Sequence, residues 1–155
     1  MPKTRTALLA LLALLSLSAC ASGPSPQEAA STIPLAAGRS PEMDQLIAKA
    51  AKAYDVPVTL VHRVVARESS YNPRARNGPY YGLMQILPET ARTMGYQGPA
   101  SGLLDPAVNL TYGVKYLRGA WLLSYGNQNT AIMWYSRGYY YEARRRGMLA
   151  EVGLR

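Results

Sequence analysis

Residues 58–73 read VTLVHRVVARESSYNP. The valines of this stretch recur at helical spacing, so the pattern predicts an amphipathic helix with one apolar face. They are Val61, Val64 and Val65. The helix must end before Pro73, because proline disfavours the helical conformation of the residue before it. The next position on the same apolar face is Glu68, so the pattern directs one carboxylate toward the core.

The position of Glu68 on an apolar helix face needs an explanation, because it is not that of a solvent-exposed charge. It lies in the last turn of the predicted helix, where the helix dipole disfavours negative charge. Partial burial and the dipole both favour the neutral acid, which can donate a proton near neutral pH. The alternative is an ion pair with a buried arginine, for which Arg63 and Arg67 are the nearest candidates. The sequence leaves both interpretations open.

Further helices are predicted on both sides of this stretch. Ser40 and Pro41 open one before it, with an apolar period that runs to Tyr54. A loop over 71–81 should separate the helix that contains Glu68 from the later helices. Those comprise a short helix from Pro88 to near Gly95, a long helix capped by Asp105 and Pro106, a segment capped by Asn129 or Thr130, and a last one over 139–149. No stretch alternates with period two, so we predict a single all-α domain over residues 41–155.

The N-terminal residues have the pattern of a targeting segment. Two basic residues, Lys3 and Arg5, precede an apolar run over 7–19, which is shorter than the roughly 20 residues that cross a bilayer. The run ends just before Cys20, the only cysteine, in a sequence that resembles the lipobox of bacterial lipoproteins. We therefore predict a lipoprotein signal peptide over 1–19 and a membrane anchor through lipid on Cys20.

The next residues predict a flexible tether. Residues 20–40 are rich in Ala, Ser, Pro and Gly and have no apolar period. Ala21 follows the cysteine, as in lipoproteins that are sorted to the outer membrane. We therefore expect the protein to be an outer-membrane lipoprotein on the periplasmic face of the cell envelope.

Composition narrows the possible ligands. One Cys and one His leave too few soft ligands for a zinc or iron–sulfur site, so we expect no metal and no cofactor. The formal net charge of +8 suits anionic envelope polymers. Nucleic acid would fit the charge but not the expected location. For His62 we favour a structural role, and for Arg144–Arg146 a solvated helix end over an anion-binding site.

Several ordered motifs resemble the soluble-lytic-transglycosylase-like (SLT) domain family, which is related in fold to goose-type lysozyme. They are Glu68-Ser69-Ser70-Tyr71-Asn72-Pro73, then Gly82-Leu83-Met84-Gln85-Ile86, then Asp105-Pro106 with Asn109. The resemblance implies a lysozyme-like helical domain with a substrate cleft, in which Glu68 is the catalytic acid. The substrate-binding residues that it implies are Ser69, Tyr71, Gly82, Leu83, Met84, Gln85, Tyr135 and Ser136.

The last motif departs from the family pattern. Where the family usually has Ala-Tyr-Asn-Ala-Gly, this chain has Trp134-Tyr135-Ser136-Arg137-Gly138. The family implies that Tyr135 helps to orient the catalytic Glu, and Ser136 replaces an amide by a shorter hydroxyl. Residues 78–81 lack the usual small side chains, so we expect a narrower groove.

The resemblance implies a peptidoglycan lytic transglycosylase. Such a lyase cleaves the β-1,4 bond from MurNAc to GlcNAc without water and leaves 1,6-anhydro-MurNAc ends, with Glu68 acting as acid and then as base. Two alternatives remain at this point: a peptidoglycan-binding lipoprotein without catalysis, and a lysozyme-type hydrolase on the same fold. The expected partners are glycan strands and the membrane.

Overall fold

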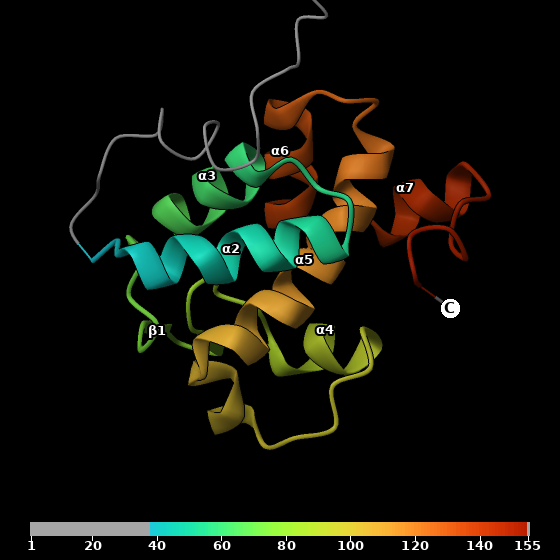
Figure 1. The fold of residues 1–155 in the computed structure, drawn as a ribbon. Helices are drawn as coiled ribbons and strands as arrows, with labels where there is room; N and C mark the ends of the chain where they lie inside the picture. Colours follow the sequence, from blue (N-terminus) through green and yellow to red (C-terminus); the bar gives the residue numbers. More distant parts are fainter. Residues whose placement is uncertain (1–37, 155) are drawn as a thin grey trace, which may run out of the picture.

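The computed structural model describes residues 38–154 (Figure 1). The predicted signal peptide, Cys20 and most of the predicted tether lie outside the described residues. The helices that the structure describes are α2 (Pro41–Ala53), α3 (Val58–Ser69), α4 (Pro88–Thr93), the 3-10 helix η1 (Ala100–Leu104), α5 (Pro106–Leu123), α6 (Gln128–Arg137) and α7 (Tyr140–Arg145). The predicted all-α class is confirmed.

Two helix starts follow the predicted caps. The side chain of Ser40 accepts a hydrogen bond from the backbone N–H of Met43, and Pro41 occupies the first position of α2. Asp105 accepts from the backbone N–H of Val108 at the start of α5 in the same way. Each cap satisfies one of the amide groups that a helix N-terminus leaves unpaired.

The start of α6 differs from the prediction. Its N-cap is Asn127, whose side-chain oxygen accepts from the backbone N–H of Thr130 at 3.0 Å. Asn129 and Thr130, the predicted caps, lie inside the first turn. All three residues can cap a helix, so residue type alone did not fix the position.

The predicted loop over 71–81 contains a small hairpin. Strand β1 (Arg76–Asn77) pairs antiparallel with β2 (Tyr80–Tyr81), with Arg76 opposite Tyr81. Strands of two residues are too short to show a period, which is why the sequence did not predict them. Helix α7 also ends earlier than predicted, since Gly147 takes a left-handed conformation with φ of +70° just after it.

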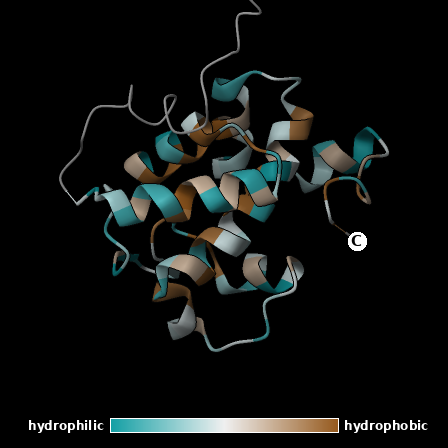
Figure 2. Cartoon of the chain, viewed as in Figure 1, coloured by the Kyte–Doolittle hydropathy of each residue, from teal (hydrophilic) through white to brown (hydrophobic). Residues whose placement is uncertain are grey.

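The core forms around α5, which runs through both parts of the molecule (Figure 1). Helices α2, α3 and α6 pack in one part, and the hairpin, α4 and η1 lie in the other. Side chains with no exposed surface include Ile47 of α2, Leu60 of α3 and Leu117 of α5. Figure 2 shows that these helices carry both hydrophobic and hydrophilic segments. Because α3 ends where the two parts meet, Glu68 lies beside the loops of the second part.

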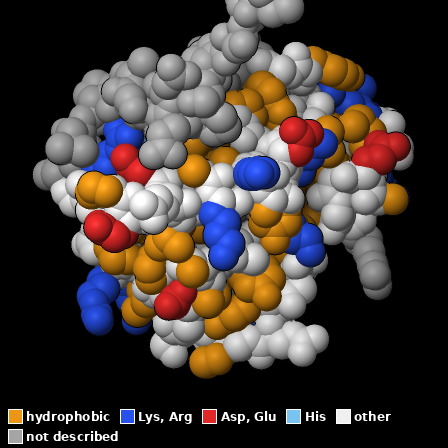
Figure 3. Space-filling view, viewed as in Figure 1, with side chains coloured by type: hydrophobic (Ala, Val, Ile, Leu, Met, Phe, Trp, Pro, Cys, Tyr) orange, Lys and Arg blue, Asp and Glu red, His pale blue; other side chains and the backbone are white. Residues whose placement is uncertain are grey.

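The described surface gives no single basic face in the view of Figure 3. There, Lys and Arg side chains are spread between hydrophobic ones. No helix within residues 38–154 combines the length and apolar character that crossing a bilayer requires.

Candidate active site

Glu68 lies in the last turn of α3, directly before the turn that ends the helix. Ser70 and Tyr71 both have positive φ, of +49° and +64°, and reverse the chain there. The Glu68 side chain is only 23 % exposed. This burial raises the pKa of the Glu68 carboxyl, and the positive charge of Arg67 opposes the rise. The direction agrees with the neutral acid that the sequence predicts.

A buried arginine does not account for Glu68. The Arg67 Nε atom lies 3.7 Å from Glu68 Oε1, but the Arg67 side chain is 56 % exposed. Arg63 points elsewhere and donates hydrogen bonds to the side-chain oxygens of Gln128 and Asn129. Among residues 38–154, Glu68 thus has the ion pair with Arg67 that the sequence offered as one alternative, but that arginine is exposed and not buried.

The end of α3 is tied to the turn over residues 82–86. The hydroxyl of Ser69 donates to the backbone carbonyl of Leu83 at 2.8 Å and to that of Val65 at 3.1 Å. Ser69, predicted to bind substrate, therefore uses its only donor to join two elements of the fold. This link fixes the position of its neighbour Glu68 relative to the turn.

The side chain of Asn109, on α5, forms hydrogen bonds with the same turn and with the residues beside it. Its side-chain amide donates to the carbonyls of Tyr81 and Leu103 at 2.8 and 2.7 Å, and its oxygen accepts from the N–H of Met84 at 2.9 Å. Gly82 is required here, because its φ is +70° and a Cβ would lie 2.4 Å from the Asn109 amide nitrogen. The buried amide thus bonds to backbone groups of the turn, of β2 and of η1, and joins these three elements.

Tyr135, on α6, also forms a hydrogen bond with this turn. Its phenol donates a 2.7 Å hydrogen bond to the backbone carbonyl of Met84, and the residue is 9 % exposed. Burial raises the pKa of Tyr135 well above its usual value, and the nearby Glu68 carboxylate raises it further. The phenol proton is thus directed at the turn, while the ring stays within electrostatic reach of Glu68.

A hollow of about 250 Å³ lies between this turn and α6. Three predicted site residues line it: Gln85, Tyr135 and Ser136. Ser136 is exposed and donates its hydroxyl proton to the carbonyl of Ile132, one turn back on α6. Tyr80 of the predicted narrowing segment also lines the hollow. Hydroxyl, phenol and amide groups over a partly apolar floor are suited to sugar rings.

Three predicted substrate-binding residues lie in the core instead. Tyr71, Leu83 and Met84 are at most 1 % exposed. The positive φ of Tyr71 turns its ring inward, and its hydroxyl lies 3.0 Å from Nδ1 of the buried His62. These side chains are buried and shape the turn, and direct substrate contacts of the three residues stay a prediction.

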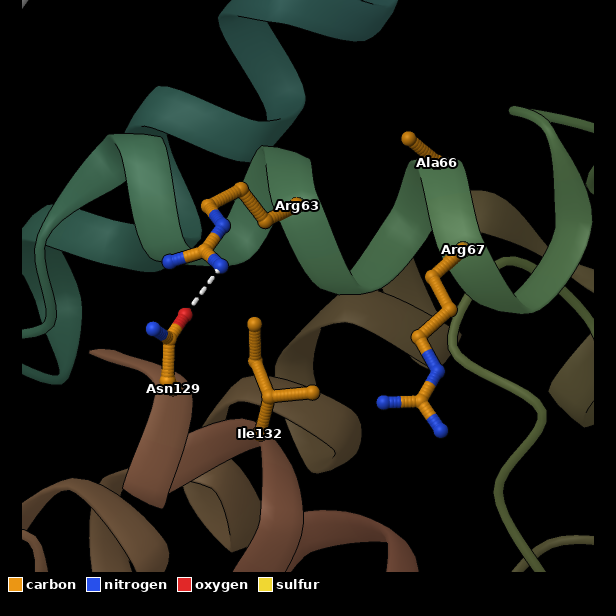
Figure 4. A pocket seen from close by; sticks show the side chains of 5 residues that line it. All are labelled: Arg63, Ala66, Arg67, Asn129 and Ile132. Atoms are coloured by element: carbon orange, nitrogen blue, oxygen red, sulfur yellow. Dashed lines mark hydrogen bonds between the residues drawn. The ribbon is translucent and has the colours of Figure 1, made fainter.

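Two groups of residues take positions in the structure that the sequence did not predict. Arg63 and Arg67 line a second hollow, of about 590 Å³, between α3 and α6 (Figure 4). Their spacing of four residues, which places them on one helix face, was the available signal. Asn109 belongs to the third sequence motif, but its hydrogen bonds to residues 81, 84 and 103 were not predicted from that motif.

The chemistry available at the site is proton transfer. Neither of the two hollows is lined by a carboxylate. In the part of the chain that the structure describes, no three His, Cys, Asp or Glu side chains gather to hold a metal ion. Because burial raises the pKa of Glu68, its carboxyl group can give a proton and take it back, within electrostatic reach of Tyr135, which lines the smaller hollow.

Comparison with known proteins agrees with this geometry. The family model described as "Transglycosylase SLT domain" matches residues 45–146. A transglycosylase of Enterobacteria phage PRD1 is 38 % identical over 95 residues, which is 61 % of this chain and 34 % of the phage protein. Membrane-bound lytic murein transglycosylase C of Haemophilus influenzae (strain PittGG) is 38 % identical over 86 residues, covering 50 % of this chain and 23 % of that protein.

The homologue from Histophilus somni (strain 2336), with the same name, is 40 % identical over 80 residues, which is 46 % of this chain and 22 % of that protein. This chain thus spans about a third or less of the length of these curated relatives. The family match includes Glu68, the turn over 82–86 and Tyr135. The chain therefore belongs to the transglycosylase SLT domain family.

Proposed function

We propose that this protein is a peptidoglycan lytic transglycosylase that cleaves the β-1,4 bond from MurNAc to GlcNAc without water. The observation that carries the proposal is the position of Glu68, a half-buried carboxyl group with a raised pKa beside a tyrosine-lined hollow. Family membership and the names of the relatives support the reaction class. The products are strands that end in 1,6-anhydro-MurNAc.

In the first step, Glu68 donates its proton to the glycosidic oxygen. The bond from that oxygen to C1 of MurNAc breaks, and the GlcNAc part leaves as an alcohol. The 2-acetamido group of MurNAc assists departure by bonding to C1. Burial of Glu68 supports this step because it favours the protonated form that the step requires.

In the second step, the ionised Glu68 takes the proton of the C6 hydroxyl of MurNAc. The C6 oxygen attacks C1, displaces the acetamido group and closes the anhydro ring. No water is consumed, and Glu68 ends protonated for the next cycle. Glycosidases that hydrolyse the bond commonly use a pair of carboxylates, so a site built on one carboxylate favours the lyase.

The sugar subsites lie along the hollow beside Glu68. Gln85, Tyr135 and Ser136 line that hollow. Their protons are already donated to backbone carbonyls, so we expect their oxygens to act as acceptors for sugar hydroxyl groups. Ser69 and Gly82 act on the shape of the site, because their contacts hold the end of α3 and the turn. Tyr71, Leu83 and Met84 support the same turn from the core.

We further propose that the enzyme domain, 41–155, is tethered by residues 20–40 to lipid on Cys20, after removal of a signal peptide over 1–19. The outer membrane, on its periplasmic face, is the proposed site. The leader pattern supports this, and so does the term "membrane-bound" in the names of relatives. A Cys20→Ala variant should move the protein out of the membrane fraction, and its retention there would contradict the lipid anchor.

The test of the reaction compares Glu68→Gln with Glu89→Gln, which alters an exposed acid at the start of α4. We expect Glu68→Gln to lower the release of fragments from purified peptidoglycan by at least about a hundredfold, the contribution of a general acid. Glu89→Gln should match the unmodified protein. Full activity of Glu68→Gln would overturn the assignment, and release by neither protein from a folded sample would indicate a binding protein.

A further inference from the structure

The second hollow has a chemistry that the cleavage mechanism does not use. Arg63 and Arg67 project from α3 toward α6, which contributes Asn129 and Ile132 on the opposite side (Figure 4). Two guanidinium groups thus flank a space of about 590 Å³ whose other walls are an amide and aliphatic groups. Such a lining fits an anionic ligand with an apolar part.

Arg63 is held in place without losing its charge. Its guanidinium donates to the side-chain oxygens of Gln128 and Asn129 at 3.0 and 2.6 Å. Both acceptors are neutral amides, and no carboxylate lies within ion-pair distance of Arg63 among residues 38–154. A fixed, uncompensated guanidinium loses less conformational freedom when it binds an anion.

Arg67 lines the second hollow and also lies beside Glu68. Its Nε lies 3.7 Å from Glu68 Oε1, while its side chain remains 56 % exposed. Burial favours the protonated form of Glu68, in which that group does not neutralise Arg67. An anion beside Arg67 would therefore lie next to the bond that Glu68 protonates.

We propose that Arg63 and Arg67 bind carboxylate groups of the peptidoglycan strand and so select strands that carry them beside the cleaved bond. This proposal rests on the proposed function. Guanidinium forks match carboxylate geometry, and Ile132 offers the apolar contact for the carbon chain that bears the carboxylate. The carboxylates come either from the stem peptide or from the lactyl group of MurNAc after the peptide has been removed.

The test uses full-length protein and a charge-matched pair of double variants. Arg63→Gln with Arg67→Gln removes the two charges of the hollow. Arg92→Gln with Arg144→Gln removes two exposed charges elsewhere. The substrates are intact strands, strands with carboxylates converted to amides, and peptide-free strands with lactyl carboxylates. All rates are measured at the pH optimum of each protein.

We expect the first double variant to raise KM for intact strands about tenfold, which is the value of one or two charge-assisted contacts, with kcat changed less than about twofold. KM for amidated strands should not change, and the control pair should match the unmodified protein throughout. If KM also rises for peptide-free strands, the arginines bind the lactyl carboxylate. If KM for these strands does not change, they bind carboxylates of the stem peptide. An unchanged KM on intact strands, or an equal rise on amidated ones, would overturn the proposal.

A binding measurement separates this proposal from the cleavage reaction. With Glu68→Gln as the common background, protein that sediments with insoluble peptidoglycan is measured with and without the arginine changes. Arg67→Gln alone is included. Because Arg67 is 56 % exposed and makes no hydrogen bond to α6, we expect this variant to fold like the unmodified protein. Lower binding by Arg67→Gln supports the carboxylate site even if the unmodified protein cleaves nothing. Equal binding of all variants would refute it.

Discussion

The phenol of Tyr135 donates a 2.7 Å hydrogen bond to the backbone carbonyl of Met84, across 51 residues of sequence. The adjacent carbonyl, of Leu83, accepts from the hydroxyl of Ser69 at 2.8 Å. One turn is therefore bonded both to the residue next to Glu68 and to the tyrosine that lines the hollow. This double attachment holds Glu68 and the hollow in a fixed relation, as the proposed catalysis requires.

Tyr135→Phe tests the importance of that hydrogen bond. It should lower the free energy of unfolding by about 1–2 kcal/mol, because the Met84 carbonyl is left buried without a partner. Turnover should fall about tenfold or more, since the turn loses its link to α6. Tyr139→Phe is the matched control, because it removes a 2.8 Å bond to the Tyr116 carbonyl, and Glu68 affects the pKa of Tyr135 but not that of Tyr139. Equal turnover in the two variants would contradict the proposed role of Tyr135.

Gly82→Ala tests the close packing of the turn on Asn109. Gly82 and Gly147 both have φ of +70°, but a Cβ at Gly82 would lie 2.5 Å from the Leu103 carbonyl, whereas one at Gly147 meets nothing within 4 Å. Gly147→Ala should cost about 1 kcal/mol of stability through backbone strain alone. Gly82→Ala should cost about 2 kcal/mol more through overpacking, as measured by urea unfolding. Equal losses would show that the turn has room for a side chain.

Because His62 is buried, the stability of the fold should fall as the pH is lowered. Burial lowers the pKa of His62 from 6.5 to about 4, and the charge of Arg39 adds to the effect. Below pH 6.5 the unfolded chain takes up the proton first, so stability is lost as the pH falls from 6.5 toward 4. The loss amounts to up to about 3 kcal/mol. Urea unfolding of His62→Gln between these pH values should show a smaller loss. An unchanged slope would mean that His62 titrates normally.

Arg67 should lower the upper pH limit of activity, against the larger effect of the burial of Glu68. The charge of Arg67 lowers the pKa of Glu68 against the effect of burial, so Arg67→Gln should raise that pKa further. Because the first step needs protonated Glu68, the fall of kcat on the alkaline side should move to higher pH. Amidated strands serve as substrate, so that carboxylate binding does not contribute. A shift to lower pH, or none, would contradict this electrostatic relation.

The sequence predicted the helices and the exceptional position of Glu68 because both depend on local patterns. The apolar period of α3 and the caps at Ser40 and Asp105 are encoded within a few residues. The hairpin at Arg76–Tyr81 was missed because strands of two residues carry no period. The cap at Asn127 was missed because nearby residues have the same capping ability.

The candidate site was predicted less completely because its contacts join distant elements. Motif position alone suggested that Tyr71 touches substrate, but two residues with positive φ turn its ring into the core beside His62. Asn109 forms its hydrogen bonds with residues 81, 84 and 103, which no local pattern brings together. The hollow between Arg63, Arg67 and α6 likewise exists only after the helices pack.

The most direct test of the central claim is the mass of the fragments released from purified peptidoglycan in water labelled with heavy oxygen. If Glu68 gives its proton and then takes one from the C6 hydroxyl, each new end is an anhydro sugar. Such ends are lighter by one water than reducing ends and free of heavy oxygen, and Glu68→Gln should produce none of them. Reducing ends that carry heavy oxygen would contradict the lyase and indicate a lysozyme-type hydrolase.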